Sequence, residues 1–415
     1  MARLAIVDAS LADGSRVDVV VEDERVVEVA PGAGRSTDDR VDAGGGLLLP
    51  AYIDTHVHLD KVLIRDQLEE HDGSLAGAIG AIHAAKRAYT VEDVRRRARA
   101  VIEASVLTGT TRLRSHVDVD TIGGLLPLEG VLAAAGDCAD IADVQLVAFP
   151  QEGIVRDPGA ADLMVEAMER GATVVGGMPH WEATEDDQRE HVRFCFELAA
   201  RFDADVDMHV DETDDGAVRT LAMVLAETER TGWQRRVTVG HVCALAAADD
   251  AYADRMAAGC ARLGITVVSN PVTNLVLQGR GDRGLVRRGT TRVRELMAAG
   301  VPVAFGQDCV QDGFYPFGRG DLLEVALVSA HAAFLTTADE QLQALAAVTT
   351  VPADAWHLGA EYGMAPGARA DLQLHVARTW PEVLRLQDPP RQVWFRGRPV
   401  ARTTITRELL SRPRG

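Results

Sequence analysis

The chain has 415 residues, a formal net charge of −19, 47% apolar residues and 5% aromatic residues. This length suits a large α/β barrel with one appendage better than a single minimal domain. The negative charge argues against nucleic acid or an anionic membrane as a partner, because both require a basic face. No apolar stretch approaches the roughly 20 residues of a membrane helix, so we expect a small-molecule partner and no membrane.

The cysteines and the start of the chain indicate the cellular compartment. The five cysteines are odd in number, scattered and without a CxxC pair, which is typical of free thiols in a reducing compartment. The first residues lack the basic-then-apolar pattern of a signal peptide. We therefore expect a cytoplasmic protein, for which a homo-oligomer is a compatible assembly.

Both ends of the chain are predicted to form β-structure. Near the N-terminus, apolar or alternating runs lie between glycine and aspartate residues, at 4–7, 17–21 and 25–29. Two runs near the C-terminus have the same character, at 370–376 and 392–400. We therefore predict one small flanking β-sandwich made by both chain termini, from residues 1–49 and 366–415.

The middle of the chain alternates between strands and helices. Apolar runs predict strands at 52–59, 111–117, 145–150, 173–178, 205–210, 237–242, 266–270 and 302–306. One helical pattern opens with a capping box at Thr90, runs through 94–106 and stops at Gly109, and another follows Thr337. About eight βα units predict an α/β protein with a (β/α)8 TIM barrel over residues 50–365, whose active site lies at the C-terminal strand ends.

Side chains suited to metal binding follow several of these strands. His56 and His58 are two residues apart, so a strand directs both imidazoles to the same side. His209, His241 and Asp308 each lie at or just past the end of a later strand. Imidazole with carboxylate, and no thiolate cluster, is the ligand set of a catalytic zinc, iron or manganese site. This set predicts a metal-activated water that attacks an unsaturated carbon.

Each of these residues also has a plainer interpretation when it is considered alone. Glu212 could be a solvated loop acid, Asp308 a helix N-cap, and His241 a structural histidine. Lys61 follows the first two histidines closely and is either a substrate contact or anchor, or a surface lysine. The strand at 173–178 ends without a lysine, so a carbamylated bridging lysine is not expected and one metal ion is favoured over two.

Four longer stretches carry a resemblance to a known family. They are His56–Asp60, Arg114–Asp118, Val147–Ile154 and Asp207–Glu212. On these stretches the chain resembles cytosine deaminase and its relatives in the amidohydrolase superfamily. The run that contains Gln151 is specific to this subfamily, whereas the His-x-His pair alone indicates only the superfamily.

The resemblance implies a (β/α)8 barrel with a flanking β-sandwich and one divalent metal ion (Zn, Fe or Mn). It implies four metal ligands, which are His56, His58, His209 and Asp308. It also implies that Glu212 moves protons, that His241 orients or polarises the attacking oxygen, and that Asp308 takes part in catalysis. Gln151 would hydrogen-bond the carbonyl and ring nitrogen of a pyrimidine.

The chain departs from the family pattern after the strand at 302–306. The family's His-Asp-Asp is replaced by Gln307-Asp308-Cys309, and its tryptophan is replaced by Phe314. The metal aspartate is kept, but Cys309 and Phe314 are expected to give the substrate pocket a different wall.

The predicted function is therefore a hydrolytic deaminase that releases ammonia from a cytosine-like or related nitrogen heterocycle. The alternatives are hydrolysis of a cyclic amide, hydrolysis of an alkylamino-triazine C–N bond, and an inactive metal-binding barrel. A nucleic-acid deaminase is not expected, because its PCxxC zinc signature is absent.

Overall fold

A barrel of eight parallel strands forms the centre of the molecule, in a computed structural model that describes residues 3–68 and 75–410. The strands are β6 (Tyr52–Val57), β7 (Thr110–Asp118), β8 (Asp143–Phe149), β9 (Val174–Gly177), β10 (Asp205–Val210), β11 (Val237–His241), β12 (Thr266–Ser269) and β13 (Val303–Phe305). Every strand contains valine, and all of their residues are buried except the first three of β8 and the first of β10, as expected for a parallel sheet covered on both faces.

Backbone hydrogen bonds close this sheet between its first and last strands. The amide of Asp308, just after β13, donates to the carbonyl of His56 over 2.7 Å. The amide of His58 donates to the carbonyl of Asp308 over 3.1 Å. The predicted TIM barrel is confirmed, and its closure brings three of the predicted ligand residues into one backbone ladder.

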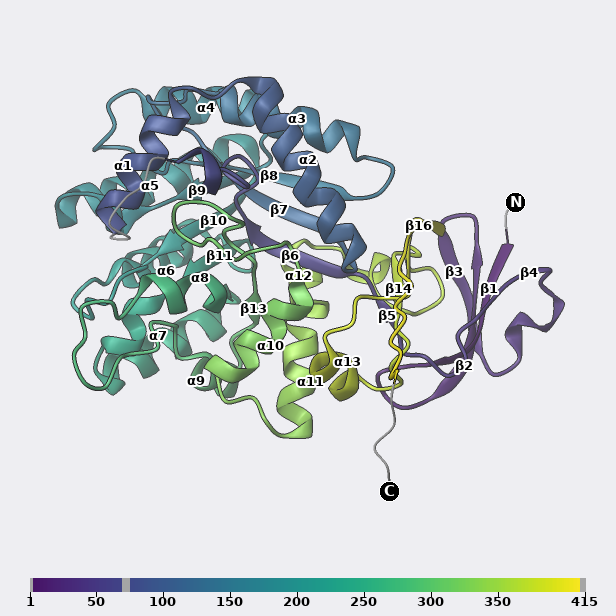
Figure 1. The fold of residues 1–415 in the computed structure, drawn as a ribbon. Coiled ribbons are helices and arrows are strands. Elements are labelled where there is room, and N and C mark those ends of the chain that lie inside the picture. The colour runs from purple at the N-terminus through teal and green to yellow at the C-terminus, as the bar shows by residue number, and fades with distance from the viewer. Residues whose placement is uncertain (1–2, 69–74, 411–415) are drawn as a thin grey trace.

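Helices surround the barrel (Figure 1). They are α1 (Leu75–Lys86), α2 (Val91–Leu107), α3 (Leu126–Asp137), α4 (Ala160–Arg170), α5 (Glu185–Phe202), α6 (Thr220–Thr231), α7 (Asp250–Leu263), α8 (Pro271–Leu277), α9 (Val293–Ala298), α10 (Leu322–Ala332), α11 (Ala338–Ala346), α12 (Thr350–Ala355) and α13 (Trp380–Leu386). Thr90 caps α2 by accepting from the Asp93 amide, and Thr337 forms a full capping box with Glu340 on α11. Within the described residues, no helix combines the length and apolarity that a bilayer crossing requires.

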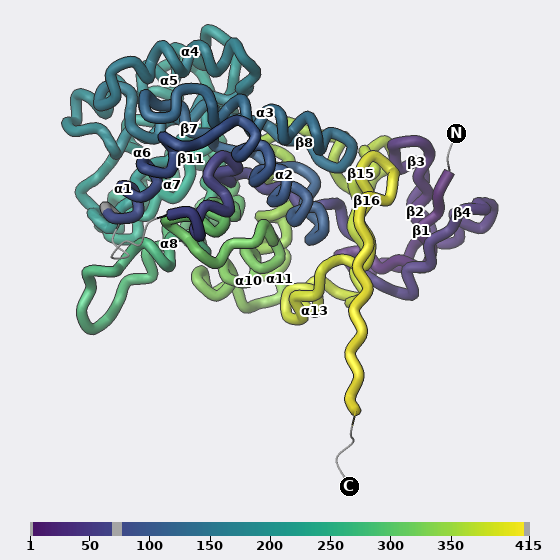
Figure 2. The backbone as a smooth tube through the Cα atoms, turned by 45° about the horizontal axis from the view of Figure 1, so that its top comes forward, coloured from purple at the N-terminus to yellow at the C-terminus, as the bar shows by residue number. Residues whose placement is uncertain are grey.

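Both chain ends build a pair of four-stranded sheets beside the barrel (Figure 1). One sheet contains β1 (Arg3–Ser10), β2 (Arg16–Glu22), β3 (Arg25–Ala30) and β4 (Asp39–Asp42). The other contains β5 (Leu48–Pro50), β14 (Leu372–Leu374), β15 (Gln392–Phe395) and β16 (Arg398–Arg402). Ile6, Val19, Leu372 and Trp394 belong to one apolar cluster shared by the two sheets, so the predicted terminal sandwich is confirmed. The segment after β16 extends away from both sheets (Figure 2).

The run at 392–400, predicted as one strand, is a hairpin of β15 and β16. Arg396 and Gly397 between them have φ values of 49° and 73°. Two consecutive residues with positive φ reverse the chain in the sense that suits a two-residue hairpin turn. The turn occupies only Arg396 and Gly397, so the strand-like run on both sides was taken as continuous.

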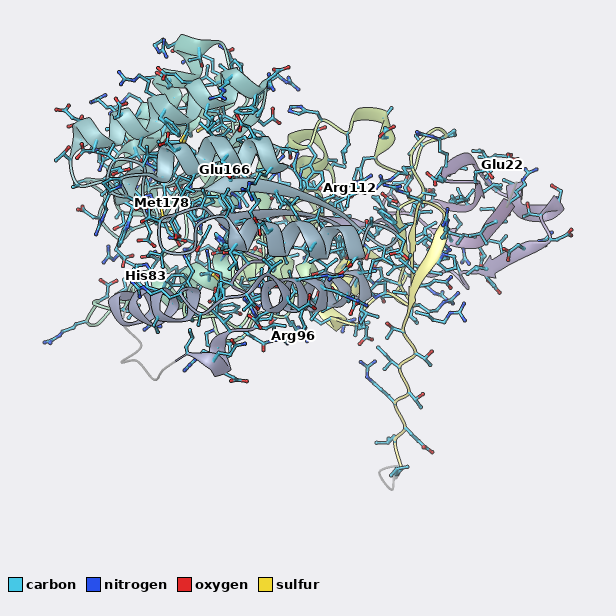
Figure 3. The ribbon with its side chains drawn as sticks, turned by 90° about the horizontal axis from the view of Figure 1, so that it is seen from above. Glu22, His83, Arg96, Arg112, Glu166 and Met178 are labelled. Atoms are coloured by element: carbon cyan, nitrogen blue, oxygen red, sulfur yellow. The ribbon has the colours of Figure 1, made fainter. Side chains whose placement is uncertain are left out.

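Buried ion pairs join the barrel to the terminal sheets. The Nη2 atom of Arg112, on β7, lies 2.9 Å from the Oδ2 atom of Asp371. Figure 3 shows Arg112 between the barrel, where His83 and Met178 lie, and the sandwich that carries Glu22. This contact lies where the barrel meets the terminal sheets. The site described next lies elsewhere, at the C-terminal ends of the barrel strands.

Candidate active site

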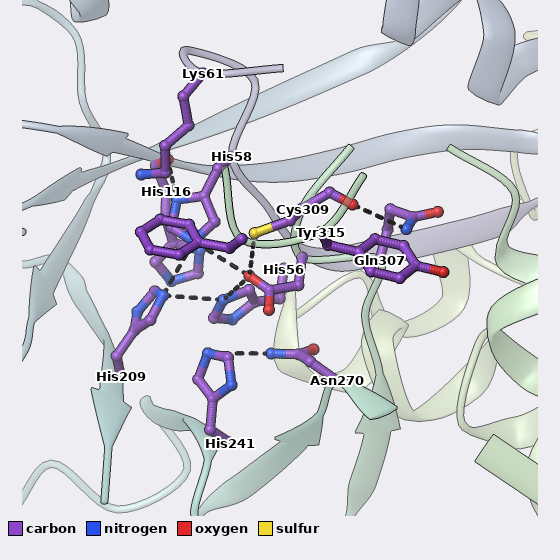
Figure 4. A network of polar contacts seen from close by, with 12 residues as sticks. His56, His58, Lys61, His116, His209, His241, Asn270, Gln307, Cys309 and Tyr315 are labelled. Atoms are coloured by element: carbon purple, nitrogen blue, oxygen red, sulfur yellow. Dashed lines mark hydrogen bonds and ion pairs between the residues drawn. The ribbon is translucent and has the colours of Figure 1, made fainter. Parts of the chain in front are cut away.

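Three imidazoles and one carboxylate converge at the C-terminal ends of the barrel strands (Figure 4). The Nε2 atom of His209 lies 3.2 Å from Nε2 of His56 and 3.1 Å from Nε2 of His58. The Oδ1 atom of Asp308 lies 3.5 Å from the His56 nitrogen and 3.3 Å from the His58 nitrogen. All four side chains are buried. The structure therefore brings together the four residues predicted as ligands.

The surroundings fix the orientation of these rings. The Nδ1 atom of His58 donates to the carbonyl of His116 over 3.0 Å, which leaves its Nε2 lone pair facing the cluster. The His209 ring stacks on Phe149, with centroids 4.1 Å apart. Next to His56 stands Gly240, where a Cβ atom would lie 2.8 Å from the imidazole Cε1. A glycine is needed there because any side chain would displace His56.

Burial sets the charge of the cluster. It lowers the pKa of His58 to about 4 and holds the pKa values of His56 and His209 well below the ordinary value, so the rings are neutral. Burial alone would raise the pKa of Asp308, but the imidazoles around it, His241 foremost, hold that pKa well below the usual range. Neutral imidazoles beside an ionised carboxylate are the protonation states that metal ligands require.

Glu212 and His241 form a second group beside the first. The Oε1 atom of Glu212 lies 3.2 Å from Nδ1 of His241 and accepts a hydrogen bond from Asn274 over 3.0 Å. Asn274 also lies 3.1 Å from Nδ1 of His241, and Asn270 lies 3.3 Å from its Nε2. Burial raises the pKa of Glu212 to about 7, although His241 opposes the shift. A carboxyl group with this pKa can give or take a proton at neutral pH.

Two of these strand-end residues have a left-handed backbone. The φ values are 70° at His241 and 62° at Asp308. Non-glycine residues with positive φ cost of order 1–3 kcal/mol and cluster at functional sites. The turn after each strand aims these two side chains back over the barrel mouth.

A cavity of about 370 Å³ opens above the ligand cluster. The predicted substrate contacts Lys61, Gln151, Cys309 and Phe314 all line it, together with Glu212. Apolar side chains complete one part of the wall, and these are Ile79, Ile82, Met178, Trp181, Val218 and Leu277. His180 also lines this cavity. Lys61 is buried, so the alternative of a surface lysine is wrong.

His116, in the stretch Arg114–Asp118 that carries the family resemblance, lies behind the ligands. Its ring centroid is 4.1 Å from that of His56, and its Nε2 lies 3.2 Å from Oδ1 of Asp207. Asp207 is also paired with Arg114 over 2.9 Å. These contacts make His116 part of the packing that supports His56.

Two features of the site had no signal in the sequence. Asn274, on the short helix α8, joins Glu212 to His241 from the far side of the barrel mouth. Glu182 accepts hydrogen bonds from the amides of residues 154–156 and contacts His191 over 2.8 Å. Neither residue follows a strand end, which was the only pattern that marked the site.

Comparisons with known proteins agree with this geometry. The model of the amidohydrolase family matches residues 39–401. A pterin deaminase of Rhizobium rhizogenes is 33% identical over 393 residues, which cover 94% of this chain and 88% of that protein. The crystal structure of 5-methylcytosine deaminase from Klebsiella pneumoniae with 5-fluorocytosine is 34% identical, with a TM-score of 0.93 over 98% of this chain and 99% of that one. The N-isopropylammelide isopropylaminohydrolase of Burkholderia multivorans is 30% identical, with a TM-score of 0.85 over 97% and 99% of the two chains.

Proposed function

The chain belongs to the amidohydrolase family, and from this premise we propose that it is a metal-dependent deaminase of cytosine carrying an apolar ring substituent. The predicted class, a hydrolase of non-peptide C–N bonds, is confirmed by the family match and the deaminase relatives. The observation that carries the proposal is the placement of Glu212 and Gln151 around one cavity above a buried His/Asp ligand set. The five free cysteines, all buried, support a cytoplasmic location.

The ligand set fits one divalent metal ion. Ligand atoms bound at about 2.0–2.2 Å around a tetrahedral zinc lie roughly 3.3–3.6 Å apart, and the recorded spacings among the four residues are 3.1–3.5 Å. His241 lies within 4.8 Å of His56, His209 and Asp308, but its Nδ1 atom faces Asn274 and its Nε2 atom faces Asn270. We therefore assign His56, His58, His209 and Asp308 as the ligands of a zinc, iron or manganese ion.

Two neighbouring groups do not fit a second ion. Asp207, next to His116, is paired with Arg114 over 2.9 Å. Asp118, which lies near His58 and Asp60, contacts the ammonium groups of two lysines at 2.6 Å each. Because these carboxylates already face cations, a further cation would be repelled. This supports a single ion per chain.

The side chains of the cavity supply the proton transfers of a hydrolytic deamination. A divalent metal held by these ligands would lower the pKa of water from 15.7 to about 7 and so supply hydroxide at neutral pH. Asp308 takes the proton of the attacking water, and His241 polarises the site beside it. Glu212, whose pKa lies at about 7, donates a proton to the ring nitrogen. Water adds to the carbon that bears the amino group. The proton taken by Asp308 then passes to the amino group and the hydroxyl proton returns to Glu212, so the C–N bond breaks to leave a carbonyl and ammonia.

Gln151 and Cys309 support the choice of substrate. An amide side chain can donate to a ring carbonyl and accept from the neighbouring ring N–H, which suits cytosine. Burial raises the pKa of the Cys309 thiol well above its ordinary value, so the wall carries a neutral sulfur that lines the cavity with Phe314 and Ile82. Such a wall favours a methyl or another apolar substituent over a polar one.

A pterin is the second candidate. The cavity of about 370 Å³ falls within the range that holds ligands larger than one small ring. Trp181 and Leu277 extend its apolar wall away from the ligand cluster, and the Rhizobium relative is named a pterin deaminase. A two-ring substrate would place its second ring against these side chains.

The test follows product formation by the metal-reconstituted protein. The products measured are ammonia from a deaminated ring, an alkylamine from the triazine and the ring-opened acid from the cyclic amide. The panel contains cytosine, 5-methylcytosine, pterin, an alkylamino-triazine and a cyclic amide. We expect the highest kcat/KM for 5-methylcytosine. A preference for pterin would select the second candidate, and hydrolysis of the triazine or cyclic amide without deamination would contradict both. An inactive barrel would bind metal and form no product from any of the five.

A further inference from the structure

A buried cluster of charges lies beside the cavity, on the side of β6 and β7. The Lys61 ammonium lies 2.6 Å from Oδ1 of Asp118. The Lys86 ammonium, at the end of α1, lies 2.6 Å from Oδ2 of Asp118 and 2.6 Å from Oδ2 of Asp120. All four side chains are buried. Burying four charges is costly even when they are paired, and the mechanism above uses none of them.

Lys61 makes one contact outside this cluster. Its ammonium donates to the Oε1 atom of Gln151 over 3.3 Å. The other atom of the same amide, Nε2, lies 3.4 Å from the sulfur of Met178. An ammonium group has donors and no acceptor, so only the amide oxygen of Gln151 can face it.

Resting on the proposed function, we propose that Lys61 is a positioning residue, which fixes the orientation of the Gln151 amide and thereby selects substrates with a lactam edge. With Oε1 held toward Lys61, Gln151 keeps its N–H groups for a substrate carbonyl and its second oxygen lone pair for the adjacent ring N–H. The flipped amide would place its NH₂ group against the ammonium. Lys61 therefore excludes the flipped orientation of the Gln151 amide. In that orientation the amide could not bind a carbonyl and the adjacent N–H.

The rest of the cluster holds Lys61 in place. Burial alone would lower the pKa of Lys61, but Asp118 and Asp60 outweigh it and raise that pKa, so the side chain stays cationic. Asp118 is in turn held by Lys86 on its other oxygen. The Lys61 ammonium cannot move toward the substrate without leaving a buried carboxylate short of a partner, which costs more than the contact would gain.

A double-mutant cycle between Lys61 and Gln151 tests the inference. The four proteins are the wild type, Lys61→Met, Gln151→Ala and the double variant, each measured for kcat and KM with 5-methylcytosine and for binding of the product thymine by calorimetry. We expect Lys61→Met to raise KM and the thymine Kd about tenfold, on the scale of a lost charge-assisted hydrogen bond, with a smaller change in kcat. In the Gln151→Ala background, Lys61→Met should change neither value by more than about twofold.

Lys86→Met is the comparison variant, because Lys86 holds Asp118 and lines the cavity but makes no contact with Gln151. We expect it to lower thermal stability and to raise KM less than Lys61→Met does, because the Lys61 contact with Gln151 remains. If Lys61→Met does not fold, the same cycle is run with Lys61→Gln, which keeps a polar group for Asp118. Equal losses from the Lys61 change in both Gln151 backgrounds would show direct contact with the substrate and overturn the inference. If the wild-type protein itself turns over no lactam substrate, the proposed function is refuted instead.

Discussion

At the residue scale, the assignment of Glu212 as the proton carrier leads to a direct prediction. Glu212→Gln keeps the shape of the side chain and its contact with Asn274, but removes the transferable proton. We expect kcat to fall by roughly 10²-fold or more, the usual scale of general acid–base catalysis, while the metal content is unchanged. Steady-state kinetics and metal analysis on the same samples check this. Near-normal turnover would refute the role.

The raised pKa of Glu212 also predicts how activity depends on pH. The protonated carboxyl donates to the ring nitrogen, and burial raises its pKa to about 7. Turnover should therefore fall as the pH rises through about 7, because the donor loses its proton. The profile of kcat between about pH 5 and 9 should show this descending limb in the wild type. The residual activity of Glu212→Gln should lack it, and an identical descending limb in both proteins would assign the limb to another group.

Cys309 offers a prediction about substrate choice. An aspartate at this position would replace a neutral thiol by a charge, which an apolar substituent can approach only at a desolvation cost. Cys309→Asp should therefore shift the ratio of kcat/KM from 5-methylcytosine toward cytosine by about tenfold or more, on the scale of about 1–3 kcal/mol for one methyl group in a pocket. If cytosine is already the best substrate and the variant leaves the ranking unchanged, the idea of an apolar wall is wrong.

At the scale of elements, Glu182 holds the loop after β8 in place. Its carboxylate accepts from the amides of Ile154 and Arg156 over 2.6 and 3.0 Å and contacts His191. Burial alone would raise the pKa of Glu182, but His191 and these amides outweigh it and lower that pKa. A carboxyl group with a lowered folded-state pKa stabilises the protein above its unfolded pKa of about 4.3, and that stability is lost as the pH falls further.

We therefore expect Glu182→Gln to lower the free energy of unfolding by about 2 kcal/mol at pH 7. The difference from the wild type should shrink as the pH falls below about 4.3. Urea unfolding at several pH values measures both effects. Glu185→Gln, three residues along on the surface of α5, is the control and should change stability by less than about 0.5 kcal/mol. A constant difference across the pH range would show that Glu182 acts through packing alone.

The strand pattern explains how much of this molecule was predictable from its sequence. Buried parallel strands read as short apolar runs, and in a barrel their C-terminal ends meet at one face. His209 and Asp308 could therefore be placed together although β10 and β13 lie far apart in the chain. Asn274 and Glu182 could not, because their partners are 62 and 28 residues away and no local pattern marks either residue. The hairpin at Arg396 was missed because its turn interrupts the strand-like run by only two residues.

At the scale of the whole molecule, the proposed metal site links distant parts of the barrel. His56 and His58 belong to the segment of β6, His209 to β10, and Asp308 to the turn after β13. An ion bound by all four would join the first, fifth and last barrel strands, so it should stabilise the folded state as a ligand does. The unfolded chain does not hold these residues together and would bind the ion far more weakly.

The proposed site predicts one divalent ion per chain and a loss of folding stability when the ion is removed. At free metal about 1,000-fold above Kd, a single site contributes about 4 kcal/mol, so chelation should lower Tm by several degrees and readdition should restore it. His209→Ala should lose metal and turnover together, because it removes one of four ligands. His83→Ala should keep the metal, because its imidazole contacts Glu152 instead. Elemental analysis and calorimetry of the same samples measure the stoichiometry and Tm. A ratio near two ions per chain would contradict the single site. An unchanged Tm after chelation would contradict the stabilising role of the ion.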